Sequence, residues 1–522
     1  MTIKRLLLFF VLTPIAVLLS LSSLFGSLQE PQFQSRLELY QTNIALQAQA
    51  WQPEDNSNEN LSAIKAAILG EKPLEIATTQ YQQVRESVTK NFEKAESKLS
   101  ESKSIPLPAK PLGKEPPETQ VSAEEKQEKL QQSLEKLQKL QADLDLHLGI
   151  LQAQQGNTDT AIKTWEELQQ TSEVNPELGD TAAVLSGIWS DPPRLLPNSS
   201  ELINENLDGW FRSSSLSRLY EIQQRQAALS TVLAEEQEAA IASVVKLALI
   251  ATIPTVTALT GLILLVVLIG QLLIKGKESI LAQNADLPWS TPWDTETILQ
   301  VFVVGFFFMG QLLVPVLLSL LPIPRPIENV RLQALSVLVS YVMVALGALL
   351  VLYVSLKPFF PLPENWFRFR LQDRWIFWGL GGYCTALPIV VVVSLINQQL
   401  WQGQGGSNPL LQLALESQDT LALGIFFATA AIAAPIFEEV LFRGFLLPSL
   451  TRYVPVWGAI ILSSLLFAIA HLSFSEILPL TALGMVLGVV YTRSRNLLAP
   501  MLLHSLWNSG TLLSLFILGS GN

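Results

Sequence analysis

The sequence contains few cysteines, few histidines and few charged residues. Cys384 is the only cysteine among 522 residues, which excludes an intrachain disulfide and a metal cluster bound by several thiolates. Only 15% of the residues are Asp, Glu, Lys or Arg, whereas 49% are hydrophobic, a ratio that is unusual for a soluble protein. The chain is also too long for one compact core. We therefore expect a membrane protein that has more than one domain.

The few charges are unevenly distributed. From Lys246 onward the chain holds 13 basic and 12 acidic residues, while the part before it holds 21 basic and 33 acidic residues. The net charge of −11 therefore lies almost wholly in the amino-terminal half. This distribution indicates a solvated acidic domain and argues against nucleic acid as a partner.

The amino terminus has the pattern of a secretory signal. Lys4 and Arg5 precede an apolar run from Leu6 to Leu24, which is just long enough to span a bilayer. A good cleavage site is lacking, since the best small-residue pattern, Ser20 to Ser22, lies within the run itself. We expect residues 1–29 to be an uncleaved signal anchor, with a removed signal peptide as the alternative. Either reading exports the chain that follows.

Residues 30–240 are predicted to form an exported acidic α-helical domain, a possible site for a protein partner. Leucines recur at three- to four-residue spacing with charges between them, which predicts an amphipathic helix: Leu130, Leu134, Leu137, Leu140 and Leu144. Residues 105–117 are rich in proline and should be extended. Residues 146–170 resemble one tetratricopeptide-type hairpin with its turn at Gly156 and Asn157, although an ordinary helical hairpin fits equally well. His147 is expected to have no chemical role.

Eight apolar segments follow, and most approach the ~20 residues that a bilayer requires. They are Leu247–Ile274, Ile298–Leu321, Gln333–Leu356, Ile376–Ile396, Leu421–Phe437 with a charged continuation, Trp457–Ala470, Ile477–Tyr491 and Leu498–Leu518. The predicted fold class is thus all-α: a polytopic membrane helical bundle over residues 241–522, preceded by the signal anchor and the soluble α-helical domain.

The positive-inside rule gives a consistent topology. With the amino terminus in the cytoplasm, alternation of the helices places most basic loop residues there as well: Lys275, Lys277, Lys357, Arg368, Arg370, Arg374, Arg452, Arg493 and Arg495. Only Arg325 and Arg331 fall on the wrong side. We expect a multi-pass protein of a bacterial-type inner or thylakoid-like membrane, with residues 30–240 on the extracytoplasmic side.

Ionisable side chains lie within the last four apolar segments, where they are costly and therefore functional candidates. They form the patterns Glu438-Glu439-x-x-x-Arg443, Phe467-x-x-x-His471 and His504-x-x-x-Asn508. A four-residue spacing places both members of a pair on one helical face, so Glu439 and Arg443 can form an ion pair. Glu438 is rotated by about 100° from Glu439 and is free to point elsewhere.

Two features concern the geometry of this set. Pro435 removes a backbone donor and should kink its helix near the site. Counting the rise along each helix puts Glu438 at roughly 16 Å, His504 at roughly 12 Å and His471 at roughly 24 Å from the cytoplasmic interface. On this estimate His471 is too deep to meet the other two unless its helix tilts or begins later.

These residue types suit peptide-bond hydrolysis without a covalent intermediate. A carboxylate with an imidazole can hold and deprotonate water, and an imidazole with an amide can donate hydrogen bonds to a developing oxyanion. We therefore expect a hydrolase that acts on peptide bonds.

The three patterns, in this order on membrane helices, resemble the motifs of the CPBP intramembrane proteases, which include the type II CAAX prenyl endopeptidases and the bacterial abortive-infection proteins. The resemblance covers roughly residues 333–518 and implies an eight-helix membrane core. It implies that Glu438 and His471 activate water and that His504 and Asn508 form an oxyanion hole. Glu439 and Arg443 would support this geometry, and no cofactor would be needed. The resemblance does not account for residues 30–240.

Several alternatives remain at this point. Glu438, His471 and His504 would also make a two-histidine, one-glutamate zinc set. The polar residues could instead only join membrane helices, or the protein could be a non-enzymatic scaffold that binds partners through its exported domain. For the enzyme, the expected substrate is a membrane-associated protein or peptide, possibly lipidated, in contact with membrane lipid.

Overall fold

The computed structural model describes residues 3–28, 33–52, 72–104, 118–170, 176–321, 329–401, 405–407 and 419–519, together with residues 70, 327 and 413. The proline-rich stretch 105–117 lies outside the described residues. The described part is mostly helical and contains no strand. Its contacts divide the chain into two compact units, which we call the helical unit (residues 35–249) and the membrane unit (residues 1–34 with 250–521).

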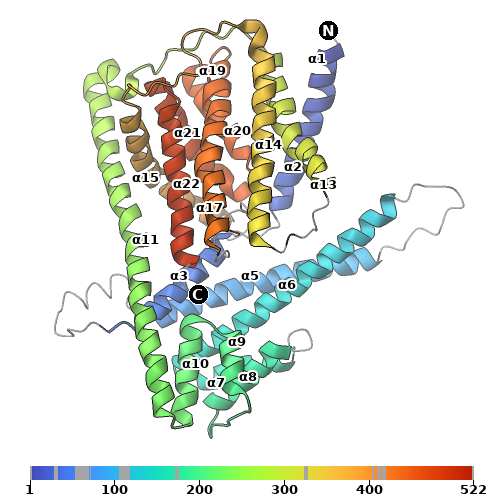
Figure 1. Ribbon diagram of the computed structural model, residues 1–522, viewed down its shortest axis with the longest axis vertical. Helices are drawn as coiled ribbons and strands as arrows, with labels where there is room; N and C mark the ends of the chain where they lie inside the picture. Colours follow the sequence, from blue (N-terminus) through green and yellow to red (C-terminus); the bar gives the residue numbers. More distant parts are fainter. Residues whose placement is uncertain are drawn as a thin grey trace, which may run out of the picture. The chain divides into compact units, whose positions relative to one another are not determined.

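The helical unit is built from α-helices that enclose one apolar core. These are α3 Phe33–Gln49, α5 Pro73–Ser104, α6 Glu118–Gln154, α7 Thr158–Gln170, α8 Pro176–Trp189, α9 Ser199–Asn206, α10 Gly209–Ile222 and the first half of α11 Gln226–Lys275 (Figure 1). Helix α6 carries the predicted leucine stripe: Leu137 and Leu140 pack against the core and Leu144 is buried in it. His147 packs edge-on against Phe211 at 4.3 Å, and its Nδ1 lies 2.7 Å from the carbonyl oxygen of Asp143.

A tight hairpin joins α6 to α7. Gly156 in the connecting turn has φ +84°, a left-handed conformation that glycine adopts at little cost. The two helices approach closely because Gly149 on α6 has no side chain; a Cβ there would clash with the ring of Trp165 on α7. The Trp165 indole is fully buried and its Nε1 donates a hydrogen bond to the Leu146 carbonyl at 3.2 Å.

Eight helices among the described residues are long and apolar enough to cross a membrane. Their elements are α1 Ile3–Leu7 continuing to α2 Thr13–Ser27, the second half of α11, α12 Thr295–Leu299 continuing to α13 Val314–Ser319, α14 Val330–Leu356, α15 Trp375–Trp401, α17 Thr420–Phe427 continuing through α18 Ala434–Glu438 to α19 Leu447–Leu450, α21 Ile477–Ser494 and α22 Leu498–Gly519. Helix α20, Val456–Ile469, is shorter. The chain is therefore an all-α, multi-pass integral membrane protein, as the sequence predicts.

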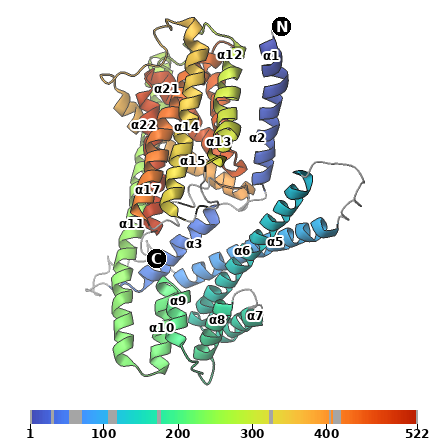
Figure 2. The ribbon, with the colours of Figure 1, turned by 45° about the vertical axis from the view of Figure 1, so that its right-hand side comes forward.

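Ion pairs join helix ends within the membrane unit. Helix α1 lies near α12 (Figure 2). Lys4 Nζ in α1 lies 3.3 Å from a carboxylate oxygen of Glu296 in α12. Arg331 at the start of α14 contacts Asp419 at the start of α17, with 2.7 Å between Nε and Oδ2. Arg331 is one of the two basic residues that the positive-inside rule leaves on the wrong side, and its carboxylate partner supplies a local reason for that position.

Candidate active site

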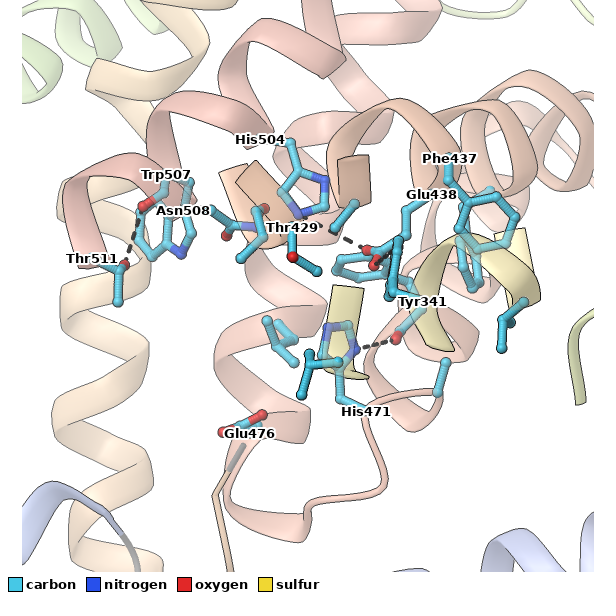
Figure 3. A pocket seen from close by; sticks show the side chains of 18 of the residues that line it. Tyr341, Thr429, Phe437, Glu438, His471, Glu476, His504, Trp507, Asn508 and Thr511 are labelled. Atoms are coloured by element: carbon cyan, nitrogen blue, oxygen red, sulfur yellow. Dashed lines mark hydrogen bonds and ion pairs between the residues drawn. The ribbon is translucent and has the colours of Figure 1, made fainter. Parts of the chain in front are cut away.

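A cavity of about 650 Å³ lies inside the membrane unit and brings the predicted residues together. Glu438, His471, His504 and Asn508 all line it (Figure 3). They come from α18, from the turn after α20, and from α22. Most of the remaining lining is apolar or aromatic, so a few polar groups face a largely apolar space.

Both oxygens of Glu438 face polar partners. Oε1 accepts a hydrogen bond from the Tyr341 hydroxyl on α14 at 3.0 Å. Oε2 lies 3.9 Å from Nε2 of His504, as the dashed line in Figure 3 shows. That separation is too long for a direct hydrogen bond, and a polar contact of this length is the kind that a water molecule bridges. The Glu438–His504 pair can therefore hold a water between a carboxylate and an imidazole.

Glu439, the next residue along the helix, contacts both Arg443 and His504. Its Oε1 accepts a hydrogen bond from Arg443 Nη1 at 2.8 Å, the predicted ion pair, and both side chains are fully buried. The same oxygen lies 2.8 Å from His504 Nδ1, a contact that the sequence does not predict. A carboxylate in this position keeps the proton on Nδ1 and turns Nε2 of His504 towards Glu438.

Arg443 has two further contacts that fix its orientation. Nη2 donates to the carbonyl oxygen of Gly484 on α21 at 3.2 Å, and the guanidinium lies 4.5 Å above the ring centroid of Phe467. A delocalised guanidinium suits this combination of a carboxylate, a carbonyl and an aromatic face. Through these contacts Arg443 connects its own helix to α20 and α21.

His471 lies in the turn directly after α20. Its ring is 5.0 Å from that of Phe467, and its Nδ1 lies 2.9 Å from the Phe467 carbonyl. It lines the same cavity as Glu438 despite the greater depth estimated from the sequence. Helix α20 ends at Ile469, and the His471 amide bonds back to Ala468 in a turn. In the described structure His471 forms no ion pair with Glu438.

Pro435 affects the helix that carries Glu438 in a specific way. The helix is π-helical over Ala428–Ala433, and the Ala434 amide bonds to Thr429 five residues earlier. In this π-helical register, the Ala430 carbonyl would accept a hydrogen bond from the amide of residue 435. In an α-helical register, the Ala431 carbonyl would accept it instead. Proline has no amide hydrogen, so both carbonyls need other donors.

Helix α22 supplies those donors. Ser505 Oγ donates to the Ala431 carbonyl at 2.6 Å, and Asn508 Nδ2 donates to the Ala430 carbonyl at 2.7 Å. These bonds fix α22, and with it His504, against the helix of Glu438. The Asn508 bond uses one of its two amide hydrogens and leaves a second for another acceptor.

The arrangement fits a zinc site poorly. In the described part of the chain, no three His, Cys, Asp or Glu side chains lie close enough together to share a metal ion. Nδ1 of His504 is held by Glu439 and Nδ1 of His471 by the Phe467 carbonyl, contacts that leave both Nε2 atoms free. The predicted zinc set of Glu438, His471 and His504 therefore depends only on the spacing of its side chains, and in the described residues these do not gather around one point.

The sequence reasoning missed Tyr341 and Ser505. Tyr341 is 97 residues before Glu438 and belongs to a helix without any recognisable motif, so no spacing could connect the two. Pro435 could have indicated Ser505 in the sequence. A proline within a helix leaves a carbonyl that needs a donor from another helix, and the serine next to His504 is one candidate.

Comparison with known proteins agrees with this geometry. Residues 420–510, from the start of α17 into α22, match the family of type II CAAX prenyl endopeptidase Rce1-like proteins. This part of the chain is similar to an Rce1-like domain.

Two bacterial membrane proteins are among the curated relatives that the chain matches. The chain is 24% identical over 215 residues to the membrane-embedded CAAX protease MroQ of Staphylococcus aureus, covering 40% of this chain and 85% of the relative. It is 26% identical over 134 residues to the putative membrane peptidase YdiL of Bacillus subtilis, covering 26% of this chain and 54% of that protein. No solved structure shows significant similarity to the chain. The family supports a membrane peptidase whose substrates are peptides in a lipid environment.

Proposed function

We propose that the membrane unit is an intramembrane endopeptidase of the glutamic type, which hydrolyses peptide bonds with water activated by Glu438 and an imidazole. The observation that carries this proposal is the 3.9 Å separation of Glu438 Oε2 and His504 Nε2 inside the cavity, with Tyr341 on the other carboxylate oxygen. Such a pair can hold water and accept its proton without a covalent intermediate.

The reaction then follows from the positions of the groups. The Glu438 carboxylate takes a proton from the water, whose oxygen bonds to the carbonyl carbon of the scissile peptide. The oxyanion that forms accepts a hydrogen bond from the second amide hydrogen of Asn508 on α22, while Nε2 of His504 holds the water beside Glu438 and His471 orients it from the turn after α20. Collapse of this intermediate breaks the C–N bond, and the proton held by Glu438 passes to the leaving amine. The products are a carboxylate and an amine.

The decisive experiment replaces the proposed base. Purified Glu438→Gln protein in proteoliposomes should lose at least about a hundredfold in cleavage of a fluorogenic farnesylated CAAX peptide or of an unmodified transmembrane peptide. Glu278→Gln is the matched control, because Glu278 is exposed in the turn that follows α11. Equal activity of the Glu438→Gln and parent proteins would refute the proposal. Full activity in strong chelator, with no zinc by elemental analysis, is the expected result for a glutamic enzyme, and loss that zinc restores would favour the metal mechanism.

The substrate and the membrane orientation belong to the same proposal. Support for a lipidated, membrane-anchored peptide comes from the Rce1-like match and from the named CAAX protease relative. Faster cleavage of the farnesylated probe than of its unmodified form is the expected result.

The amino terminus is proposed to be cytoplasmic, so protease added outside spheroplasts should digest residues 35–249, whereas protection of this unit would reverse the orientation.

A further inference from the structure

The segment that follows His471 is held from several sides. Ser473 and Ser475 are buried, at 4% and 5% exposure, although they lie in a connection between α20 and α21. The Ser475 amide donates to the Gly405 carbonyl at 3.1 Å, and Ser473 Oγ donates to the same oxygen at 3.2 Å. A connection this well bonded sets the position of the histidine two residues before it.

Helix α15 supplies a second support. Asn397 Nδ2 donates to the Ser475 carbonyl at 2.6 Å, and its Oδ1 accepts a hydrogen bond from Trp401 Nε1 at 3.0 Å. The Trp401 ring also lies 5.7 Å from the ring of Phe474. Asn397 is buried, so its amide is oriented by both bonds and cannot exchange them for water.

The third support is the helix at the amino terminus of the chain. Ser27, at its last turn, accepts a hydrogen bond from the Phe474 amide at 3.1 Å and donates to the Leu24 carbonyl at 2.7 Å. The Phe25 and Phe474 rings lie 5.7 Å apart. Without Ser27, the part-buried amide of Phe474 would lose this partner.

The other end of this helix is fixed within the membrane unit as well. Lys4 and Arg5 form ion pairs with Glu296, and Leu8 and Ala16 are buried together with Val303 of the helix after α12. Residues that a signal peptidase would remove thus form contacts along the whole length of the helix. These contacts distinguish a structural helix from a targeting sequence.

We infer that the amino-terminal helix, Ile3–Ser27, is retained in the mature protein and positions His471 by holding the 473–475 segment against α15. The positioning of His471 matters for catalysis only if the proposed function holds. Retention of the amino-terminal helix, and its contact with the 473–475 segment, can be tested without measuring activity. Ser27 and Asn397 are positioning residues, since they act on His471 through the backbone of this segment.

The first test measures contact and retention. In a Cys384→Ser background, the Phe25→Cys/Phe474→Cys protein should be joined by a short bis-thiosulfonate cross-linker in membranes, and the mass of the purified protein should include residues 3–27. The control pair is Phe10→Cys/Phe474→Cys, because Phe10 lies fifteen residues and roughly 22 Å further along the helix. An amino terminus after Ser22, or equal cross-linking of both pairs, would overturn the inference.

The second test separates positioning from simple stability. Ser27→Ala should lower kcat several-fold while KM changes less than twofold, and Ser27→Thr, which keeps the hydroxyl, should restore part of kcat. Ser22→Ala is the control, since Ser22 is exposed on the same helix. An unchanged kcat in Ser27→Ala together with positive cross-linking would refute the positioning role. Activity of Glu438→Gln equal to that of the parent would instead refute the proposed chemistry. Retention of the amino-terminal helix would then still be decided by the cross-linking and mass measurements of the first test.

Discussion

Glu439 and Arg443 illustrate how individual charged residues persist inside the membrane unit. Both side chains have 0% exposure, and removal of a single ion from water costs several kcal/mol even after relaxation. The pair offsets this cost by sharing a carboxylate oxygen with His504 and by bonding the Gly484 carbonyl. The ion pair therefore also orients the ring of His504.

Replacement of Arg443 should be among the most damaging changes in the membrane unit. Arg443→Ala removes the cation that pairs with the buried Glu439 carboxylate and leaves only the contact with His504, which costs about 3–5 kcal/mol of the free energy of unfolding. Thermal unfolding in detergent measures this loss. Arg374→Ala serves as the control because Arg374 is exposed, and an equal effect of the two substitutions would contradict the proposed role of the buried pair.

Tyr341 is expected to affect catalysis rather than stability. A hydrogen bond to a charged group contributes about 1.5–3 kcal/mol, so Tyr341→Phe should lower kcat/KM roughly tenfold or more by freeing the Glu438 carboxylate. Kinetics with the farnesylated peptide, alongside the melting temperature, test this expectation. Tyr353→Phe, on an exposed position of the same helix, should leave both values unchanged. A normal rate for Tyr341→Phe would exclude the tyrosine from the site.

Among the elements, the helix from α17 to α19 is the most irregular part of the site. It is π-helical on both sides of α18, over Ala428–Ala433 and over Glu439–Leu446. Such segments widen the helix and leave carbonyls to be satisfied by neighbours. The helix consequently depends on α22 for its geometry, and α22 depends on it for the orientation of His504.

The dependence on Pro435 can be tested by a double-mutant cycle. Ser505→Ala should cost about 0.5–1.5 kcal/mol, the range for hydrogen bonds between membrane helices, because the Ala431 carbonyl loses its donor. In a Pro435→Ala background the helix regains an amide hydrogen, so the same change should cost less. Unfolding by denaturing detergent measures all four proteins, and strict additivity would disprove the link between Ser505 and Pro435.

The start of α17 gives a prediction on pH. Asp419 lies outside the membrane-spanning segment, and the Ala422 amide together with Arg331 lowers the pKa of its carboxyl. A carboxylate with a lowered pKa stabilises the fold above its unfolded pKa of about 4, and this contribution is lost as the pH falls through the folded pKa.

Asp419→Asn should therefore be less stable than the parent near neutral pH, and the difference should shrink below about pH 4. Melting temperatures across this range provide the measurement. Asp373→Asn, at an exposed loop position, should match the parent at every pH. A difference for Asp419→Asn that persists undiminished at low pH would show that the charge is not its source.

In the whole molecule, the division of contacts into two units predicts separate responses to mutation. The helical unit depends on the close approach of Gly149 to Trp165, whereas the cavity depends on contacts within the membrane unit. A change in the core of one unit should leave the hydrogen exchange of the other unaltered.

Gly149→Ala tests this independence. The added methyl group clashes with the Trp165 ring, and overpacking of this kind costs typically about 1–3 kcal/mol. Amide exchange followed by mass spectrometry should show lower protection in α6 to α8 and unchanged protection in α20 to α22. Gly270→Ala adds the same methyl group where no atom lies within 4 Å, so it should alter neither. Loss of protection in both units would show that they unfold together.

The sequence by itself determined the all-α membrane fold, because long apolar runs have few other structures in a bilayer. It also determined the Glu439–Arg443 pair, since a spacing of four residues places both on one helical face. The candidate residues Glu438, His471, His504 and Asn508 could be named in advance because ionisable and amide groups are rare and costly in the membrane. Their roles in catalysis stay predictions.

Only the tertiary structure decided which groups face each other. The contacts of Tyr341 with Glu438 and of Glu439 with His504 join helices that are 97 and 65 residues apart in the chain. The depth of His471 could not be read from its helix, because the turn after α20 and the segment held by Ser27 set its position. Periodicity describes each helix about its own axis, whereas the rotation and tilt of one helix against another depend on packing, and packing is a property of the folded whole.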